Sequence, residues 1–534
     1  MPVARQSRFL GISRFRHAPR AARWQTCSSA GTLSGATCFL SRMPWNRLCR
    51  ATGIAPWGVT PQAARGVPSS TMNIIILGAG RVGESVAESL VSEQNDITVI
   101  DMDPARLRSL EERIDLRGVV GNGIQPSVLR EAGAKDADMV IACAANDETN
   151  LVVCKVAHDI FNVPSTIARL RSPEFIEGDE LLGKSGFAVD HVICPEESVM
   201  RYLHQLISYP EALQVLEFAG GRASLIAVRA THGSSLVGHT IGEFRDRFPH
   251  AEMRVVALYR LDAEMEANKN TRILAGDEVF VLADTQKIRY VLGAIHNIDE
   301  PAKRIMIAGG GKVGLRLARS LQGQCQVKIL ERDKARCEYL ASQLPSSMLI
   351  LNGDGADEDL LLEESVGEMD MFLALTSDDE DNIMSAMLAK RMGAGRVMAL
   401  INRRAYADMM QGSTIDIAIS PSQTVIGELL THLRRGDVAA VHSLRRGAAE
   451  ALEGIARGDV KTSKLVGRKV EELKLPKGVR IGAIVRGEGN KSEVLMPHHN
   501  TVIKADDHII MFIPNKRLVR EVERLFQVGA TFFG

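Results

Sequence analysis

The stretch NIIILGAGRVG, residues 73–83, joins a short apolar run to glycines spaced as G-x-G-x-x-G. This combination is typical of a buried strand, a tight turn and the start of a helix. The first glycine permits the turn, the second lets backbone N–H groups approach a diphosphate, and the third allows the helix to pack closely on the strand. The start of the helix also offers N–H donors and partial positive charge to an anion. We therefore predict a diphosphate-binding loop formed by Gly78, Ala79, Gly80, Arg81 and Val82.

The same pattern recurs 231 residues later as RIMIAGGGKVG, residues 304–314. Further landmarks keep nearly this offset: VIDMD at 99–103 matches ILERD at 329–333, and NDETN at 146–150 matches DDEDN at 378–382. An ordered set of matches indicates an internal duplication. It predicts a second diphosphate-binding loop, formed by Gly309, Gly310, Gly311, Lys312 and Val313.

Each half begins with short apolar segments that alternate with segments of helical period; in the first half 74–77, 97–100 and 139–142 are the apolar ones. This alternation predicts an α/β fold with a parallel, doubly wound, Rossmann-like sheet. The rest of each half has the pattern of a small α+β domain. The expected domains are two Rossmann-like domains at 72–194 and 303–419, each followed by a small α+β domain, at 214–298 and 439–524.

An acidic residue ends the second predicted strand of each half. Asp101 and Glu331 lie 18 and 17 residues beyond the third glycine of their loops, where a carboxylate can accept hydrogen bonds from the ribose of adenosine. Because a carboxylate there repels a 2′-phosphate, NAD or an adenine nucleotide is favoured over NADP. The alternative is an ordinary solvated residue at a strand end.

Further candidates follow the third, fourth and fifth predicted strands. Asn122 and Asp354 each lie between two glycines and can contact the adenine base, although such turns are also common without a ligand. Ala144 and Ala145 are expected to line the pocket at the carboxyl edge of the sheet, where ligands of this fold bind. Arg169 can reach a phosphate or a neighbouring subunit, and an ordinary surface arginine is its alternative.

Charge is distributed unevenly along the chain. The 534 residues include 65 basic and 65 acidic ones, a balance that disfavours a globally basic nucleic-acid binder. Residues 1–71, however, contain ten Arg, no Lys and no acidic residue. We interpret them as a disordered extension such as an organellar transit peptide, or as upstream sequence joined by a wrong start, with Met72 as the initiator. The second interpretation is favoured, because the first strand begins directly after Met72.

The patterns that would indicate catalysis or metal binding are missing. The sequence has no H-E-x-x-H and no G-x-S-x-G, and its cysteines show no metal-ligand spacing. Neither Rossmann-like domain carries the large insertion that a dehydrogenase needs for its second substrate. We therefore expect no catalytic residue and no metal, and we expect the nucleotide to act as a signal. An NAD-dependent oxidoreductase and an NAD-sensing transcription regulator stay open as alternatives, although no separate helix-turn-helix segment is found.

The duplicated glycine loops, the acids after them and the paired NDETN and DDEDN segments resemble the RCK family (regulator of K⁺ conductance, also KTN), from Met72 to the end of the chain. The segments DNIMSAMLAKRMGA at 381–394 and INRRAY at 401–406 are the most specific. The resemblance implies tandem RCK-N and RCK-C domains, in the order predicted above. It also implies that NAD(H), and ATP or ADP, bind the RCK-N domains at the residues already named. One departure is Gly121-Asn122, where the family often has Gly-Asp.

The same resemblance implies a regulatory subunit that gates a potassium-translocating membrane protein of a bacterial uptake system. Such a subunit forms a homo-oligomeric ring on the cytoplasmic face of the inner membrane, touches the membrane only through its partner and binds no nucleic acid. We expect nucleotide binding to shift the angle between the two RCK-N domains. The apolar stripes at 202–207 and 425–433 are candidate subunit contacts, and a core within the chain is the alternative.

Overall fold

The computed structural model describes residues 71–528, except for 94, 177–178, 250–251, 262, 297–300, 411–413, 434–436, 446–447, 488 and 490–491. The predictions for residues 1–70 therefore lie outside the described residues. The described residues belong to one of two compact units of the chain, Ser69–Gly534.

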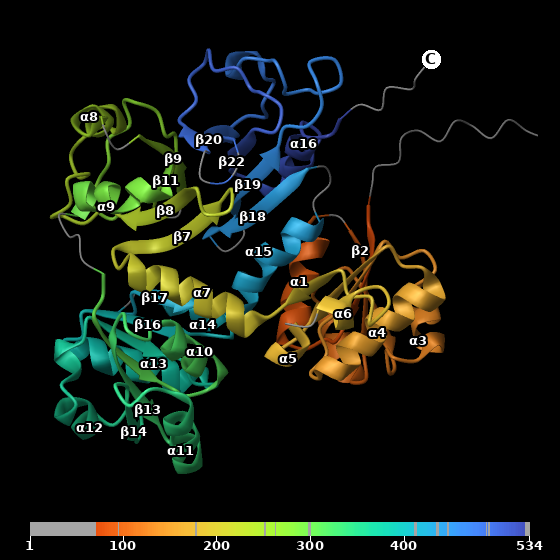
Figure 1. Cartoon of the computed structure of the whole chain (residues 1–534), viewed down its shortest axis with the longest axis horizontal. Helices are drawn as coiled ribbons and strands as arrows, with labels where there is room; N and C mark the ends of the chain where they lie inside the picture. The colour runs from red at the N-terminus through yellow and green to blue at the C-terminus, as the bar shows by residue number, and fades with distance from the viewer. Residues whose placement is uncertain are drawn as a thin grey trace, which may run out of the picture. The chain divides into compact units, whose positions relative to one another are not determined.

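The first sheet is parallel and has the strand order β3-β2-β1-β4-β5-β6. Helices follow its strands along the chain and lie beside the sheet (Figure 1). The order reverses between β1 and β4, which confirms the doubly wound topology predicted from the sequence. Its strands are β1 (Asn73–Leu77), β2 (Asp96–Asp101), β3 (Arg117–Val120), β4 (Met139–Ala142), β5 (Ser165–Arg169) and β6 (His191–Ile193). Its helices are α1 (Arg81–Val91), α2 (Pro104–Glu111), α3 (Pro126–Glu131), α4 (Asp147–Phe161), α5 (Pro173–Ile176) and α6 (Asp179–Leu182).

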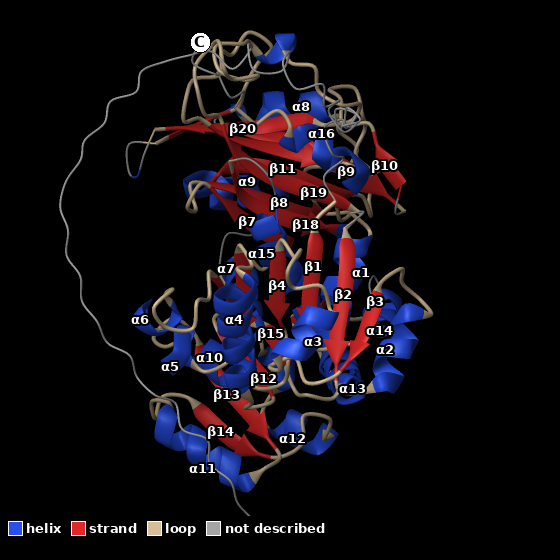
Figure 2. Ribbon diagram, turned by 90° about the vertical axis from the view of Figure 1, so that its right-hand side faces the viewer, coloured by secondary structure: helices blue, strands red, loops and turns tan. Residues whose placement is uncertain are grey.

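The duplicated half builds a second parallel sheet with the equivalent order, β14-β13-β12-β15-β16-β17. Figure 2 labels β14, β13, β12 and β15 of this sheet. Its strands are β12 (Arg304–Ala308), β13 (Gln326–Glu331), β14 (Leu349–Asn352), β15 (Met371–Ala374), β16 (Arg396–Leu400) and β17 (Ile417–Ile419). Its helical segments are α10 (Lys312–Ser320), α11 (Lys334–Gln343), α12 (Glu358–Glu363), η4 (Val366–Glu368), α13 (Asp379–Arg391) and α14 (Arg404–Met410).

Each half ends in an antiparallel sheet, with the equivalent strand orders β10-β9-β11-β8-β7 and β21-β20-β22-β19-β18. Phe280 of the first and Phe512 of the second lie in one shared apolar core. The first sheet domain comprises β7 (Ala212–Phe218), β8 (Ala223–Arg229), α8 (Ile241–Arg247), β9 (Met253–Arg260), β10 (Ala263–Met265), β11 (Glu278–Asp284), η3 (Thr285–Lys287) and α9 (Ile288–His296). The second comprises β18 (Val438–Leu444), β19 (Ala449–Ile455), η6 (Val470–Glu472), β20 (Arg480–Arg486), β21 (Glu493–Leu495), β22 (His508–Ile513), η8 (Lys516–Leu518) and α16 (Val519–Glu523).

Two helices connect the parallel sheets to the antiparallel ones, and each packs on the other half of the chain. Helix α7 (Pro195–Ser208) follows the first parallel sheet but contacts α10, and α15 (Pro421–Leu433) follows the second but contacts α1 (Figure 1). Leu203 of α7 is buried in the core of the second parallel sheet, and Leu429 of α15 in that of the first. The buried residues of these stripes thus form a core within the chain, so the structure supports that alternative and not a subunit contact.

Candidate nucleotide-binding sites

The first and third glycines of both loops are required by the backbone itself. Gly78 and Gly309 have φ angles of 101° and 110°, which side chains rarely adopt. A Cβ on Gly83 would lie 1.9 Å from the carbonyl oxygen of Gly78, and one on Gly314 would lie 2.2 Å from that of Gly309. These four glycines therefore make the turn and allow the helix to approach the strand, as the sequence predicted.

The second glycines, Gly80 and Gly311, meet no such requirement. Their φ angles are −78° and −66°, and a Cβ on either would have no atom of the described protein within 4 Å. Each is the N-cap of its helix, α1 or α10, and no side chain caps these helix starts. The backbone N–H groups in the first turns of α1 and α10 thus have no side-chain partner at the cap position. Because Gly80 and Gly311 have no side chain, the space beside these N–H groups stays unfilled.

The two strand-end acids, whose predicted role is to bind the ribose, lie against these loops. The carboxylate of Asp101 accepts a hydrogen bond from the backbone N–H of Ala79 at 2.6 Å, and that of Glu331 accepts one from Gly310 at 2.9 Å. Each carboxylate also accepts a bond from the backbone N–H two residues further on. These bonds fix the carboxylates beside the loop, and a carboxylate has about four acceptor positions, so capacity remains for ribose hydroxyls.

The remaining loop residues occupy the positions expected of them. Arg81 and Lys312 are the first residues of α1 and α10 and are exposed, whereas Val82 and Val313 are half-buried. Ala144 is half-buried and Ala145 exposed after the carboxyl end of β4.

Asn122 and Asp354 stabilise their own turns. The side-chain oxygen of Asn122 accepts a hydrogen bond from the N–H of Ile124 at 3.2 Å, and that of Asp354 accepts one from Ala356 at 2.9 Å. These are Asx turns, the role that such residues have without any ligand. Recognition of adenine by Asn122 or Asp354 stays a prediction.

A buried asparagine joins two strand ends in each half, a role that the sequence did not indicate. Asn150 is 0% exposed; its Oδ1 accepts from the N–H of Ala144 at 2.8 Å, and its Nδ2 donates to the carbonyls of Ala144 and Arg169. Asn382 makes the equivalent bonds to Thr376 and Leu400. The only indication of this role in the sequence was that the asparagine recurs in NDETN and DDEDN. Its hydrogen-bond partners could be identified only from the fold.

An aspartate three residues before each of these asparagines accepts hydrogen bonds from the backbone of the loop that follows β5 or β16. Asp147 accepts hydrogen bonds from the N–H groups of Arg171 and Ser172. Asp379 accepts them from Asn402 and Arg403. The conspicuous repeated acidic segments therefore build the carboxyl edges of the two parallel sheets.

Arg169 is not an ordinary surface arginine. Its Nε is buried and has no hydrogen-bond partner among the described residues, and burial lowers the pKa of its guanidinium, with a further contribution from Arg171. It ends β5 and interacts with Cys143, whose carbonyl oxygen lies 2.9 Å from where a Cβ of Gly78 would be. An unsatisfied donor beside the glycine loop fits an anionic ligand. The equivalent residue of the second half is Leu400.

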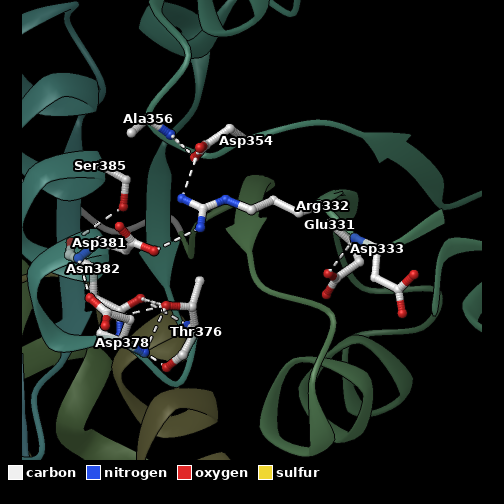
Figure 3. Close-up of polar contacts among 10 residues, drawn as sticks. All are labelled: Glu331, Arg332, Asp333, Asp354, Ala356, Thr376, Asp378, Asp381, Asn382 and Ser385. Atoms are coloured by element: carbon white, nitrogen blue, oxygen red, sulfur yellow. Dashed lines mark hydrogen bonds and ion pairs between the residues drawn. The ribbon is translucent and has the colours of Figure 1, made fainter. Parts of the chain in front are cut away.

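The second site contains an ionic bridge that was not predicted. The guanidinium of Arg332 lies between Asp354, at 2.8 Å, and Asp381, at 2.9 Å (Figure 3). The hydrogen bonds that Arg332 donates to both carboxylates raise its pKa. Burial alone would raise the pKa of Asp354, but the bond from Arg332 and that from the Ala356 N–H together lower it. The first half has Met102, Asn122 and Thr149 at these three positions.

The thiol of Cys143 lies beside the first loop and is buried. Burial raises the pKa of the Cys143 thiol beside the first loop to about 12, so this thiol is protonated at neutral pH and is a poor nucleophile. Among the described residues, no group of three or more His, Cys, Asp or Glu side chains is placed to hold a metal ion. Within the same residues, every helix is too short or too polar to cross a membrane.

Two cavities lie apart from these loops. One, of about 680 Å³, is lined by residues that include Tyr202 and His442, and the other, of about 1260 Å³, by residues that include Cys325 and Arg396. Neither contains a predicted site residue. The candidate nucleotide sites therefore rest on the geometry of the glycine loops and on the groups that surround them.

Two domain families match the chain, each of them twice. The TrkA-N domain matches residues 74–195 and 305–421, and the TrkA-C domain matches residues 225–295 and 459–527. The first two ranges contain every predicted site residue.

Whole-length relatives are also found. The Trk system potassium uptake protein TrkA of Vibrio alginolyticus is 51% identical over 462 residues, and that of Halomonas elongata is 49% identical over 462 residues. In both cases the match covers 86% of this chain and 100% of the relative.

Solved structures share the fold at much lower identity. The RCK domain of GsuK has a TM-score of 0.53 at 15% identity, and the match covers 86% of this chain and 95% of that chain. The GsuK channel bound to NAD has a TM-score of 0.53 at 16% identity, with 86% and 78% covered. Because relatives with about half of their residues identical match over their entire length, the chain belongs to the TrkA family.

Proposed function

We propose that this protein is the nucleotide-binding regulatory subunit of a Trk-type potassium-uptake system. In this proposal it binds NAD(H), and ATP or ADP, at its two glycine loops and gates a potassium-translocating Trk membrane subunit. The names of the whole-length relatives support the role in potassium uptake. The NAD-bound GsuK channel, which shares the fold, supports the ligand class.

The observation that carries the proposal is the pair Gly80 and Gly311. Nothing in the described protein requires glycine at these positions, yet both halves have it at the start of a helix without a side-chain cap. A diphosphate would explain both features, because it needs close approach to the backbone and N–H donors to bind.

The residues around each loop define how the nucleotide is held. The N–H groups at the starts of α1 and α10 bind the diphosphate, and Asp101 and Glu331 bind the adenosine ribose. Arg169 contributes a further cation to the first site. The bound nucleotide supplies binding free energy and undergoes no reaction.

Gating requires that the nucleotide bind one conformation of the assembly more tightly than another. A hundredfold preference would supply about 2.7 kcal/mol. The contacts of α7 and α15 connect each half to the other, so a movement of one parallel-sheet domain reaches both halves. We infer that the protein works as a homo-oligomeric ring at the cytoplasmic face of the bacterial inner membrane, where it contacts the membrane only through its partner.

An enzymatic role, such as that of an NAD-dependent oxidoreductase, has less support. The potentially nucleophilic thiol beside the first loop has a raised pKa, and the polar groups Asn150 and Asp147 hold backbone groups. A transcription regulator likewise has less support, because the TrkA-N and TrkA-C matches account for all four domains without a helix-turn-helix module.

The test combines ligand binding with transport. Gly80→Val and Gly311→Val fill the open space without straining the backbone, so both variants should fold and each should lose one nucleotide site by calorimetry. Gly233→Val is the matched control, because a Cβ there also meets nothing within 4 Å but the residue lies outside both sites. The double variant should fail to restore regulated potassium uptake in a strain lacking this chain. Full regulated uptake by a folded double variant that binds no nucleotide would contradict the proposal.

A further inference from the structure

The two nucleotide sites have the same backbone but different charges. The equivalent residues that differ in charge between the two halves include Met102 and Arg332, Asn122 and Asp354, Thr149 and Asp381, and Arg169 and Leu400. With the strand-end acids included, the first site therefore has one carboxylate, Asp101, and one half-buried guanidinium, that of Arg169, at these positions. The second has three carboxylates and one exposed guanidinium.

Arg169 ends β5 and Leu400 ends β16. These two residues lie where a bound nucleotide would place the group that follows its first two phosphates. In each site the acid fixes the adenosine end at β2 or β13, and the glycine loop of β1 or β12 binds the diphosphate. A ligand that continues across the sheet edge next reaches β4 and β5, or β15 and β16. At this place the first site has Arg169 with an unpartnered Nε, whereas the second has the buried, apolar Leu400.

A buried N–H without a partner is costly, and a phosphate oxygen would satisfy it with a charge-assisted hydrogen bond. Arg169 therefore favours a ligand with a terminal phosphate at this place. Leu400 offers no such bond, so its surroundings favour a ligand whose next group is an uncharged nucleoside.

The ionic bridge strengthens this contrast. Arg332 is 54% exposed, and exposed ion pairs contribute little to the stability of a fold, so the bridge has little value for stability. It neutralises only part of the charge of Asp354 and Asp381, and Glu331 adds a third carboxylate at the same end of the site. A ligand with several phosphates is repelled there more than a dinucleotide is.

We propose that the two sites divide the adenine nucleotides by charge: the first takes nucleoside polyphosphates such as ATP, and the second takes the dinucleotide NAD(H). Arg169 and Arg332 are the specificity-determining residues. This inference rests on the proposed function, because it assigns ligands to the same two sites.

The nucleotide affinity of each site can be measured separately if the other site is blocked by a glycine-to-valine substitution in its loop. In full-length Gly311→Val protein, ATP should bind more tightly than NADH by calorimetry, and in Gly80→Val protein NADH should bind more tightly than ATP. Arg169→Leu should weaken ATP at the first site at least tenfold and change NADH less than threefold. Arg169→Lys, which retains the charge, should recover part of the ATP affinity.

The second site allows a rescue experiment. Arg332→Met leaves three carboxylates without their cation, so NADH should bind at least fivefold more weakly, and added salt should reduce this loss. The triple change to the residues of the first half, Arg332→Met with Asp354→Asn and Asp381→Thr, should restore NADH affinity. Leu400→Arg should increase ATP affinity at the second site.

The outcomes separate this inference from the proposed function. Equal preference of both blocked proteins for ATP over NADH, or equal losses of both ligands in Arg169→Leu, would overturn the division by charge and leave the regulatory role intact. Failure of the triple variant to recover NADH would overturn the role of Arg332. Absence of any nucleotide binding to the unmodified, folded protein would overturn the proposed function itself.

Discussion

The imidazole rings of His191 and His432 stack with their centroids 3.6 Å apart and their planes tilted by 18°. His191 begins β6 of the first parallel sheet, and His432 lies near the end of α15, which follows the second parallel sheet. The stack therefore joins the first half to a helix connected to the second.

This pair predicts a pH dependence of stability. Burial lowers the pKa of His432 to about 4, with a contribution from His191, and burial also lowers the pKa of His191 despite the opposing effect of Asp190. A folded-state pKa below the unfolded value of about 6.5 means that full stability is present above pH 6.5 and is lost as the pH falls towards 4. Urea unfolding at pH 7.0, 5.5 and 4.5 should show this loss. His432→Gln should make it smaller, whereas His158→Gln on α4 should not; an unchanged slope in His432→Gln would refute the assignment.

The structure of the first glycine loop predicts that two alanine substitutions, at Gly83 and at Gly80, change the stability of the protein to very different extents. Gly83→Ala places a Cβ 1.9 Å from a backbone oxygen, so it should destabilise the protein by more than about 2 kcal/mol. Gly80→Ala meets no atom within 4 Å and should change the free energy of unfolding by less than about 1 kcal/mol. Urea denaturation measures both. Similar losses would show that the space at Gly80 is not open.

The buried asparagine predicts a loss of stability together with a loss of binding. Asn150→Ala removes the partner of the Ala144 N–H and of two carbonyls, which should cost about 2–4 kcal/mol. Because these bonds join the ends of β4 and β5, nucleotide affinity at the first site should also fall. Calorimetry in the Gly311→Val background measures this site, and the second site, held by Asn382, provides the control. Unchanged affinity at the first site would mean that Asn150 acts only on stability.

The packing of α7 and α15 on the opposite halves predicts that a cavity made in a helix of one half destabilises the other half. Leu203 of α7 is 0% exposed in the core of the second parallel sheet, so Leu203→Ala should cost about 2–5 kcal/mol. Leu362 is 69% exposed on α12, and Leu362→Ala should change stability by less than about 0.5 kcal/mol. Hydrogen exchange should locate the loss of protection in β12 and α10. Loss confined to the first half would contradict the packing of α7.

The features that sequence could predict are those determined by short segments. The apolar segment Met139–Ala142 is a strand with those bounds, and the acids Asp101 and Glu331 lie at the loops where spacing placed them. In these cases the strand, the turn and the functional group belong to one β-α-β unit, so the pattern of a single segment fixes their relation.

Other features depend on contacts between distant segments. The apolar stripe of α7 indicated a buried face, but it carried no information on which surface covers that face. The Arg332 bridge required two loops and the first turn of α13 to meet, and the arginine and two aspartates look like ordinary surface residues in the sequence. Arg169 was identified as a candidate, but its unpartnered Nε could be recognised only in the structure.

The exchange of α7 and α15 gives the molecule the architecture of a two-fold symmetric dimer in which both protomers are parts of one polypeptide. In a dimer of separate identical chains, every mutation alters both copies at once, so the two copies cannot specialise. Covalent fusion removes this constraint, because a codon change such as that between leucine and arginine at one strand end is inherited by one copy alone. Gene duplication thereby allows the two sites of a single protein to take different ligands, as we propose for this pair.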